Sequence, residues 1–372
     1  MSDVKITYLF LNGRIERIRG KKKYPVEMFY GYQYLKSRFL NVSIIEAKTT
    51  NVRAFIQKNI EHRIGHILRI PILFSEFTSF INYFKLRKSD VLIFSNHRTL
   101  ISAYPMLFIN KLFGKSLTSI VFFMGLLKEF PKNRSLHKFK IFFITKILKF
   151  TDKVFFLNKS ELQVAVEHFP SFKDIFEYYP FSVDLNFWKN EKTPKSNDVL
   201  FIGNDGERDY DAVISLVNKL DSLSFTVVSR FIDKSQITNE RCKVIQGSWN
   251  DSLLSDIDIL ELYNISRVTI VPLKESLQPS GQSVALQSMA CGTPVVITKT
   301  QGFWDFENFI DNKNICFARD NSLEEWEKKI NFFLKSSSVE YSSFSNDCEK
   351  LIKEKYSLDN INKKLESFIN NL

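Results

Sequence analysis

The sequence predicts an α/β protein made of two halves, each with a parallel β-sheet covered by helices on both faces. The chain has 372 residues, which is more than a single hydrophobic core usually serves. Short apolar runs of strand length alternate with helical patterns, as in parallel sheets with crossover helices. At residues 189–198 the polar, aperiodic stretch KNEKTPKSND interrupts this alternation, which then begins again. The two halves are therefore expected to be Rossmann-like domains.

The first half begins with KITYLFL, an apolar run that predicts a buried strand, followed by the basic loop NGRIERIRGKKKYP. Strand and helix patterns then take turns up to residue 180. We expect strands at 5–11, 41–47, 90–96, 116–124, 153–158 and 174–180, and helices at 26–39, 52–86, 99–113, 135–150 and 159–168.

The second half repeats the pattern and ends in a helical segment, 322–372, with a solvated break at the serine-rich stretch SSSVEYSSFSND. We expect strands at 199–203, 224–230, 242–247, 268–273 and 294–298, and helices at 208–220, 257–264 and 282–290. The expected division is an N-terminal domain of residues 1–188, a C-terminal domain of residues 189–355, and a C-terminal helix, 356–372, that packs back on the first domain. Two such domains facing one another form a central cleft, and ligands bind there beyond the carboxyl ends of the strands.

Composition excludes several classes of protein. Hydrophobic residues make up 44% of the chain and charged residues 25%, so a disordered or disulfide-stapled chain is not expected. The four cysteines form no CxxC pair, which argues against a zinc site or disulfide framework and fits a reducing cytoplasm. The sequence shows no secretory signal. It also has no HExxH or Walker A motif, so no metal or ATP cofactor is indicated.

Charge is distributed unequally between the halves. Residues 1–190 hold 31 Lys+Arg and 14 Asp+Glu, a net +17, whereas residues 191–372 carry a net −6. The first half also holds 25 of the 36 phenylalanines, an excess that genomic composition alone could produce. A basic surface rich in Phe suits an anionic membrane. The apolar stretch 64–84 contains Arg69, Pro71 and Glu76, so it predicts a segment that lies on a membrane rather than one that spans it.

A second membrane candidate is SLHKFKIFFITKILKF at 135–150, where lysines, Lys140 among them, interleave with apolar residues in an amphipathic pattern. The alternative is an ordinary helix with a core-facing stripe and solvated lysines. The residues expected to contact the membrane are Lys138, Phe139, Phe142, Phe143, Lys146 and Lys149.

The sharpest local signal for a binding site is LKESLQPSGQSVALQSMACGTPVVITKTQGFWD at 273–305. A turn of small residues, Ser280, Gly281, Gln282 and Ser283, opens a helix directly after a strand and loop. Backbone amides at a helix N-terminus, with its positive dipole end, suit a phosphate group, and Gly281 permits close approach of the backbone. Read structurally, the same residues are only an N-cap and a turn.

The segment LQPSGQSVALQSMACGTPVVIT resembles the donor-binding segment of retaining GT-B glycosyltransferases of family 4. Three further segments resemble that family in the expected order: KITYLFLNG, YYPFSVDLNFW at 178–188 and VLFIGNDGERD at 199–209. The resemblance implies a GT-B fold and transfer from a nucleotide-diphosphate sugar without a metal ion. The family usually has two glutamates eight residues apart, near the donor sugar and the ribose; Pro279 and Gln287 stand at these positions, and Gln287 could still bind ribose hydroxyls.

In the same family a basic pair holds the donor diphosphate. Arg208 matches its second member, Asn204 stands where an arginine is common, and Lys274 is expected to supply the other charge. Breaking a sugar–phosphate bond builds negative charge on the departing nucleotide, and cationic groups stabilise it. Trp249 is a weaker candidate for the base pocket, because tryptophan is more often a core residue.

The first half offers two candidates. Gly13, in the Asn-Gly pair that closes the first strand, would let a phosphate approach the backbone. His97 follows strand DVLIFSN at the expected ligand-binding edge and could contact the transferred sugar or the acceptor hydroxyl, although a lone histidine is more often structural.

The resemblance implies a retaining glycosyltransferase that uses a nucleotide sugar. The basic, Phe-rich first half predicts a lipid acceptor such as diacylglycerol, so that a glycolipid forms on the inner face of the cell membrane. UDP-glucose, another UDP-hexose, UDP-glucuronate or GDP-mannose would all satisfy the donor residues. A glycosyltransferase of lipopolysaccharide or capsular polysaccharide assembly is the alternative, followed by a GT-B sugar-nucleotide epimerase. Nucleic acid is not an expected partner, because no nucleic-acid fold motif accompanies basic stretches such as RIRGKKK.

Overall fold

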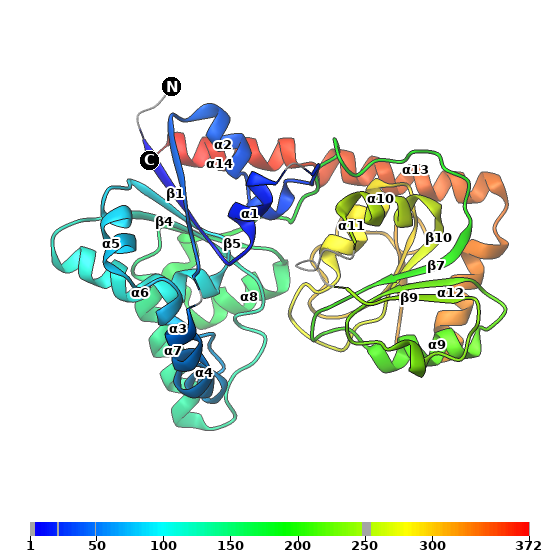
Figure 1. Ribbon diagram of the computed structural model, residues 1–372, viewed down its shortest axis with the longest axis horizontal. Coiled ribbons are helices and arrows are strands. Elements are labelled where there is room, and N and C mark those ends of the chain that lie inside the picture. Colours follow the sequence, from blue (N-terminus) through cyan, green and yellow to red (C-terminus); the bar gives the residue numbers. More distant parts are fainter. Residues whose placement is uncertain (1–3, 21, 49, 248–253, 372) are drawn as a thin grey trace. The chain divides into compact units, whose positions relative to one another are not determined.

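The structure, a computed structural model, describes residues 4–20, 22–48, 50–247 and 254–371. The chain forms two compact units, each with its own parallel sheet (Figure 1). The first unit contains residues 1–21, 29–180 and 362–372, and the second contains residues 22–28 and 181–361. A short stretch near the N-terminus therefore belongs to the second unit, and the last residues of the chain belong to the first.

The first unit has six parallel strands in the order β2-β1-β3-β4-β5-β6. The strands are β1 (Lys5–Phe10), β2 (Asn41–Glu46), β3 (Val91–Phe94), β4 (Thr118–Phe123), β5 (Lys153–Phe156) and β6 (Phe176–Tyr178). The helices are α1 (Arg14–Arg19), α2 (Tyr32–Arg38), α3 (Asn51–Ile56), the π-helix η2 (Gln57–Glu61), α4 (His62–Leu68), the turn η3 (Phe74–Glu76), α5 (Phe80–Arg87), α6 (His97–Leu112), α7 (Arg134–Leu148), α8 (Lys159–His168) and the turn η4 (Pro170–Ile175).

The second unit has six parallel strands in the order β12-β11-β10-β7-β8-β9. The strands are β7 (Asn197–Ile202), β8 (Phe225–Val228), β9 (Cys242–Ile245), β10 (Ser266–Val271), β11 (Val295–Thr298) and β12 (Cys316–Ala318). The helices and turns are η1 (Glu27–Phe29, its last residue in the first unit), α9 (Tyr210–Lys219), η5 (Lys234–Gln236), α10 (Asp256–Ile265), α11 (Gln282–Ala290), α12 (Leu323–Lys335) and α13 (Ser338–Lys355), with α14 (Leu358–Asn370) starting here and ending in the first unit.

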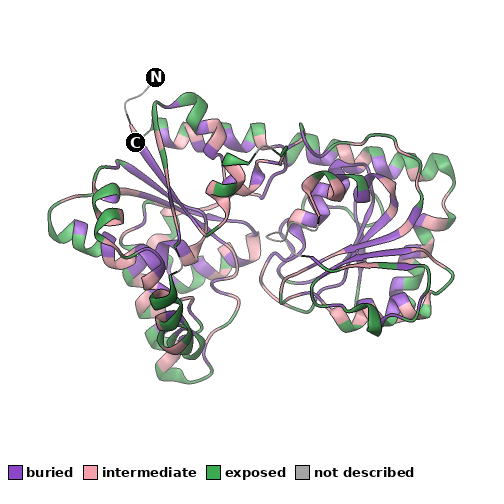
Figure 2. Cartoon of the chain, in the orientation of Figure 1, coloured by how far each residue is buried: buried purple, intermediate pink, exposed green. Residues whose placement is uncertain are grey.

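The inner strands of both sheets, such as β3, β8 and β11, are buried on their two faces, as expected for continuous apolar runs (Figure 2). Helices cover the sheets with their buried stripes and turn exposed residues to solvent. The cysteines Cys242, Cys291, Cys316 and Cys348 are free and buried in the second core. In the ranges that the structure describes, no helix has both the length and the apolarity to cross a bilayer.

The expected break in the C-terminal segment is much shorter than predicted. It covers only Ser336 and Ser337, between α12 and α13, and α13 then runs through the rest of the serine-rich stretch from Ser338 to Lys355. Ser337 caps the helix and forms a capping box with Glu340. Phe344, Cys348, Leu351 and Ile352 recur with helical spacing and are buried, so the apolar stripe outweighs the modest helix propensity of serine.

The last turns of α14 pack on α2 within the first unit. Tyr34 donates a hydrogen bond from its hydroxyl to the Glu366 carboxylate, and Arg38 lies 3.8 Å from the same carboxylate. Leu365 is fully buried. These contacts explain why residues 362–372 belong to the unit that contains the start of the chain.

Candidate donor site

Two loops of the second unit are joined by backbone hydrogen bonds at the carboxyl ends of neighbouring strands β7 and β10. Asp209 N donates to Pro272 O at 3.0 Å, and Lys274 N donates to Glu207 O at 2.8 Å. Arg208 and Leu273 form an antiparallel bridge between them. The backbone therefore brings Arg208 and Lys274 to the same edge of the sheet, where open α/β folds bind ligands.

The Arg208 side chain is buried in this edge, with 2% of the residue exposed. Its Nη1 donates to Ser280 Oγ at 2.6 Å and lies 3.0 Å from Asp205 Oδ2, while Ser280 Oγ donates to Asp205 Oδ1 at 2.8 Å. Burial lowers the pKa of Arg208, and the Asp205 carboxylate opposes that effect. Nε is buried and has no hydrogen-bond partner among the described residues. Asp205 and Ser280 therefore hold the guanidinium in place, while its Nε makes no hydrogen bond to the described residues.

Two glycines make room for this arginine. A Cβ on Gly203 would lie 2.8 Å from Arg208 Nε, so only glycine lets the side chain cross the end of β7. Gly281 has φ +78°, and a Cβ there would lie 2.5 Å from Val271 Cγ1 and 3.4 Å from Arg208 Nη1. Both positions therefore require glycine for steric reasons.

The predicted turn of small residues does open a helix, α11. Gly281 is the N-cap and has no side chain to cap the first amides. Ser280 and Gln282 are buried, and Ser283 is half-buried. Lys274 is exposed. The positive end of the α11 dipole, Arg208 and Lys274 are three sources of positive charge at this edge of the sheet.

Asn204, in the same loop, forms hydrogen bonds with two neighbouring loops. Its Nδ2 donates to Gly247 O at 2.9 Å, and its Oδ1 accepts from Arg230 N at 2.8 Å. Asn204 therefore ties together the chain segments that follow β7, β8 and β9. Trp249, the predicted base-pocket residue, lies outside the described residues.

Gln287, on α11, is 9% exposed and uses both ends of its amide inside the second unit. Its Nε2 donates to Glu27 Oε1 at 2.9 Å, and its Oε1 accepts from the Tyr263 hydroxyl at 3.3 Å. Glu27 Oε1 also accepts from Trp188 Nε1 at 2.7 Å, while Oε2 is buried without a partner among the described residues. Burial raises the pKa of Glu27 to about 7.

Glu27 is a residue that the sequence analysis missed. It lies on the stretch Lys22–Met28, which belongs to the second unit. Val26 N donates to Asp184 Oδ2 at 3.3 Å in the same region. A buried carboxylate that contacts α11 is a candidate functional group, because carboxylates with perturbed pKa values often lie at functional sites.

In the first unit, Gly13 is the N-cap of the short helix α1 and has φ 97°. The amides of Arg14 and Ile15 both donate to Glu46 Oε1, the second at 3.0 Å. The first two amides of α1 therefore face a carboxylate.

His97 is the first residue of α6, directly after the N-cap Asn96. Burial, together with the charges of Lys140 and Arg98, lowers the pKa of His97 to about 3, so the imidazole is neutral at physiological pH. Its Nδ1 is buried without a hydrogen-bond partner in the described ranges, and its ring lies 5.9 Å from that of Phe123.

The helix predicted to contact a membrane is α7. Phe139 and Phe142 are 46% and 56% exposed, and Phe143 is half-buried. The lysines at 138, 146 and 149 are exposed, but Lys140, which the amphipathic pattern included with them, is fully buried. Its position is a correction to that pattern, because Lys140 shares a helical stripe with the buried Ile144 and Ile147.

Lys140 Nζ replaces its hydration with backbone acceptors. It donates to Arg69 O at 2.8 Å, to Leu126 O at 2.9 Å and to Glu129 O at 2.7 Å. It also lies 4.8 Å from the centre of the Phe130 ring, and burial lowers its pKa to about 8.

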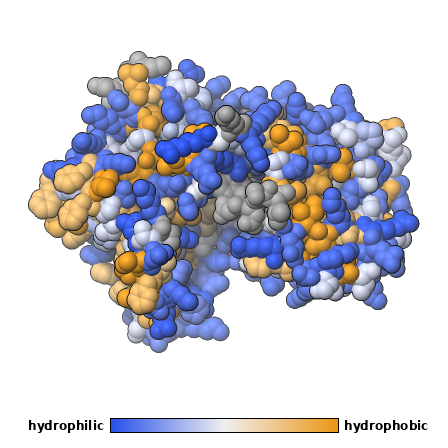
Figure 3. Space-filling view, in the orientation of Figure 1, coloured by the Kyte–Doolittle hydropathy of each residue, from blue (hydrophilic) through white to orange (hydrophobic). Residues whose placement is uncertain are grey.

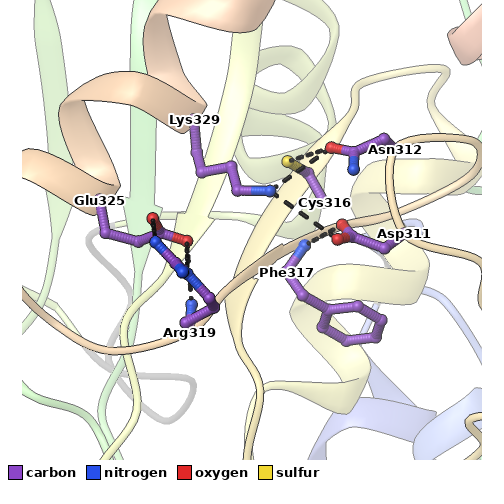
Figure 4. A network of polar contacts seen from close by, with 7 residues as sticks. All are labelled: Asp311, Asn312, Cys316, Phe317, Arg319, Glu325 and Lys329. Atoms are coloured by element: carbon purple, nitrogen blue, oxygen red, sulfur yellow. Dashed lines mark hydrogen bonds and ion pairs between the residues drawn. The ribbon is translucent and has the colours of Figure 1, made fainter.

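A cavity of about 620 Å³ lies elsewhere in the second unit, between α12 and α13. Next to it Lys329 Nζ is 3.4 Å from Asn312 Oδ1 and 3.8 Å from Asp311 Oδ2 (Figure 4). None of the predicted site residues lines this cavity. Within the described residues no cluster of His, Cys, Asp and Glu could hold a metal ion.

The C-terminal part of the chain matches a known protein family. Residues 240–367, which include α11 and its N-terminal turn, match the family model "Glycosyl transferases group 1". This segment is a glycosyltransferase domain. No curated protein sequence matches the chain.

Solved structures agree with the fold of the whole chain. HepE from Anabaena, crystallised with UDP, is 14% identical, has a TM-score of 0.69 and is matched over 99% of this chain and 100% of its own. A sucrose-phosphate synthase from Thermosynechococcus elongatus is 11% identical, with a TM-score of 0.69 and coverage of 99% and 98%. A glycosyltransferase from Rickettsia africae is 14% identical, with a TM-score of 0.64 and coverage of 98% and 97%. The predicted α/β fold is confirmed: this glycosyltransferase has the GT-B fold, with two six-stranded parallel sheets.

Proposed function

We propose that this glycosyltransferase moves a hexose or uronic acid from a UDP-sugar to a membrane lipid, such as diacylglycerol, with retention of anomeric configuration. The observation that carries the donor assignment is the buried Arg208 guanidinium, held beside Ser280 and the N-terminus of α11. A structural neighbour, Anabaena HepE, was crystallised with UDP and with UDP-glucose, which supports a UDP-sugar as donor.

In the proposed reaction, negative charge builds on UDP as the bond between the sugar and the phosphate breaks. Arg208, Lys274 and the first amides of α11 stabilise that charge, and because Arg208 is buried its interaction with the phosphate is little weakened by water. The departing phosphate oxygen accepts the proton of the attacking hydroxyl on the same face of the sugar, so no strong protein base is required. His97, neutral at physiological pH, is the residue of the first unit proposed to bind the transferred sugar or the acceptor hydroxyl.

The acceptor is proposed from the first unit. This part of the chain is strongly basic, and α7 exposes Phe139 and Phe142 together with Lys138 and Lys146. A helix with exposed aromatic and cationic side chains suits the boundary between headgroups and acyl chains of an anionic membrane. A lipid acceptor would be reached there without leaving the bilayer.

The test is turnover of a panel of donors: UDP-glucose, other UDP-hexoses, UDP-glucuronate and GDP-mannose. The purified protein is incubated with each donor and with vesicles of phosphatidylglycerol and diacylglycerol, and the lipid fraction is examined by mass spectrometry and NMR. We expect one donor to give a glycolipid with the anomeric configuration of the donor. Arg208→Ala should abolish the product and weaken UDP binding by calorimetry, whereas Arg241→Ala, at an exposed site before β9, should change neither.

Other outcomes point elsewhere. UDP-sugar binding without a glycolipid would move the acceptor to a glycan, such as a growing polysaccharide. Interconversion of the nucleotide sugar without any acceptor would indicate an epimerase. Failure to bind any nucleotide sugar would contradict the proposal.

A further inference from the structure

Exposed apolar side chains are concentrated in one stretch of the first unit's sequence. Of 22 large hydrophobic side chains that are exposed in the described ranges, eight lie between residues 52 and 84. We name them the α3–α5 surface: Val52, Phe55, Ile60, Ile64, Ile67, Phe80, Ile81 and Phe84. Figure 3 shows hydrophobic side chains gathered over α5 and over α3. Single exposed apolar residues are common, but a group of this density marks an interaction surface.

Polar contacts hold α3 and η2 against the segment that precedes α5. Arg53, on α3, donates from Nη1 to Lys48 O and Glu76 O and from Nη2 to Thr78 O, so it joins α3 to the turn that precedes α5. The buried Glu61, on η2, accepts from Ser75 N at 2.9 Å and from Ser75 Oγ at 2.7 Å. The exposed apolar side chains are therefore presented on a defined framework.

The same framework extends to α7. Lys140 Nζ donates to Arg69 O at the end of α4, and the Arg69 guanidinium lies 3.4 Å from Glu129 Oε2, just before α7. The exposed Phe139 and Phe142 of α7 thus come from a helix that is tied to α4.

Exposed cations outnumber exposed carboxylates around the α3–α5 surface. Exposed cations include Lys58, Arg63, Lys85 and Lys88. Between residues 51 and 89 the sequence holds two acidic residues, Glu61 and Glu76, and both are buried, at 6% and 5% exposure. Two exposed carboxylates lie next to this stretch, Asp90 shortly after α5 and Glu129 beside Arg69, so an anion that approaches it meets mainly cations.

We propose that the α3–α5 surface inserts its apolar side chains into an anionic bilayer, with α7 as its flank. Lysine is depleted in the cores of protein–protein interfaces, whereas apolar side chains mixed with exposed lysines and arginines fit the boundary between anionic headgroups and acyl chains. The surface is the attachment site for the lipid-acceptor reaction proposed above and rests on that function. It places the deepest contact at Phe80 and Ile81, which are 85% and 70% exposed, rather than on α7 alone.

The test is vesicle co-sedimentation of the full chain without any nucleotide sugar. Vesicles contain phosphatidylcholine alone or phosphatidylcholine mixed with phosphatidylglycerol. The double variant Phe80→Ser/Ile81→Ser should lose at least tenfold in affinity for the mixed vesicles. The matched control, Phe332→Ser/Val339→Ser, removes side chains that are 47% and 77% exposed on the second unit and should bind as the wild type does. Circular dichroism and UDP calorimetry check that both variants are folded.

Three results would overturn the inference: equal binding of wild type and Phe80→Ser/Ile81→Ser to mixed vesicles, equal binding of the wild type to both kinds of vesicle, or a wild-type oligomer that the double variant dissociates in sedimentation velocity. The last would assign the surface to a second copy of the chain. Failure of the proposed function looks different, because vesicle binding would then stay intact while no donor binds and no glycolipid forms.

Discussion

Glu27 Oε1 accepts a hydrogen bond from Gln287 Nε2 at 2.9 Å, although the two residues are 260 positions apart in the chain. The same oxygen accepts from Trp188 Nε1, and the Tyr263 hydroxyl donates to Gln287 Oε1. This pattern fixes the orientation of the amide, with its nitrogen toward the carboxylate. A side chain at 287 that only accepts hydrogen bonds would face the Glu27 carboxylate without a proton between them, so glutamine suits this position as long as Glu27 is present.

Gln287→Glu is therefore expected to destabilise the protein. It would place two buried carboxylates about one hydrogen-bond length apart, and they cannot both ionise without a penalty. We expect the free energy of unfolding to fall by about 1–3 kcal/mol at pH 8, and by less at pH 5, where one carboxyl holds a proton and can donate it. Urea unfolding at the two pH values measures this, with Gln301→Glu at an exposed site as control. An equal loss of unfolding free energy in both variants would contradict this orientation of the Gln287 amide.

Glu27 itself should make stability fall as pH rises. Its pKa is about 7 in the folded chain, above the ordinary value of 4.5, so the folded state binds the proton more tightly. Stability is therefore lost from about pH 4.5 to about pH 7, on the order of 3 kcal/mol in all, and levels off above that range. Glu27→Gln keeps an acceptor oxygen and removes the titration. The difference in free energy of unfolding between the variant and the wild type should thus grow in favour of the variant between pH 5 and pH 7. Parallel pH profiles would show that Glu27 does not titrate in this range.

The fold and part of the donor site could be predicted because their signals are local. The apolar runs of β7 and β10 identify buried strands, and the turn from Ser280 to Ser283 is a small-residue helix start that is readable from adjacent residues. Arg208 could be singled out by its place after β7, but its contact with Ser280 joins loops 72 residues apart and comes from the parallel pairing of β7 with β10.

Glu27 could not be predicted, because nothing in Lys22–Met28 distinguishes it from other loop carboxylates until Trp188 and Gln287 are placed around it. The prediction that Lys140 is solvated is wrong for a different reason. The residue type favours exposure, whereas the spacing of four and seven residues from Ile144 and Ile147 places Lys140 on the buried stripe of α7. Helical periodicity therefore predicts the burial of Lys140, and residue type does not.

Gly281→Ala should impair the donor site through the backbone. The residue has φ +78°, which costs a residue with a Cβ about 1–2 kcal/mol, and the new methyl group would lie 2.5 Å from Val271 Cγ1. We expect lower thermal stability and weaker UDP binding, because the start of α11 must shift away from Arg208. Gly206→Ala is the control in a neighbouring loop, since a Cβ there meets nothing within 4 Å. If calorimetry finds the same UDP affinity for Gly281→Ala as for the wild type, the turn before α11 does not bind the donor phosphates.

Lys140 and Lys138 offer a direct comparison of a buried and an exposed lysine on one helix. Lys140→Met keeps most of the side-chain length but leaves the carbonyl oxygens of Arg69, Leu126 and Glu129 without their donor. One or more unsatisfied buried acceptors should lower the free energy of unfolding by about 2 kcal/mol or more. Lys138→Met removes an exposed charge and should change stability by about 0.5 kcal/mol at most. Because Lys140 also holds the end of α4 against α7, hydrogen exchange of the amides around Arg69 should accelerate in Lys140→Met and not in Lys138→Met. Unchanged exchange there would mean that the packing of apolar side chains, rather than this ammonium, holds α4 on α7.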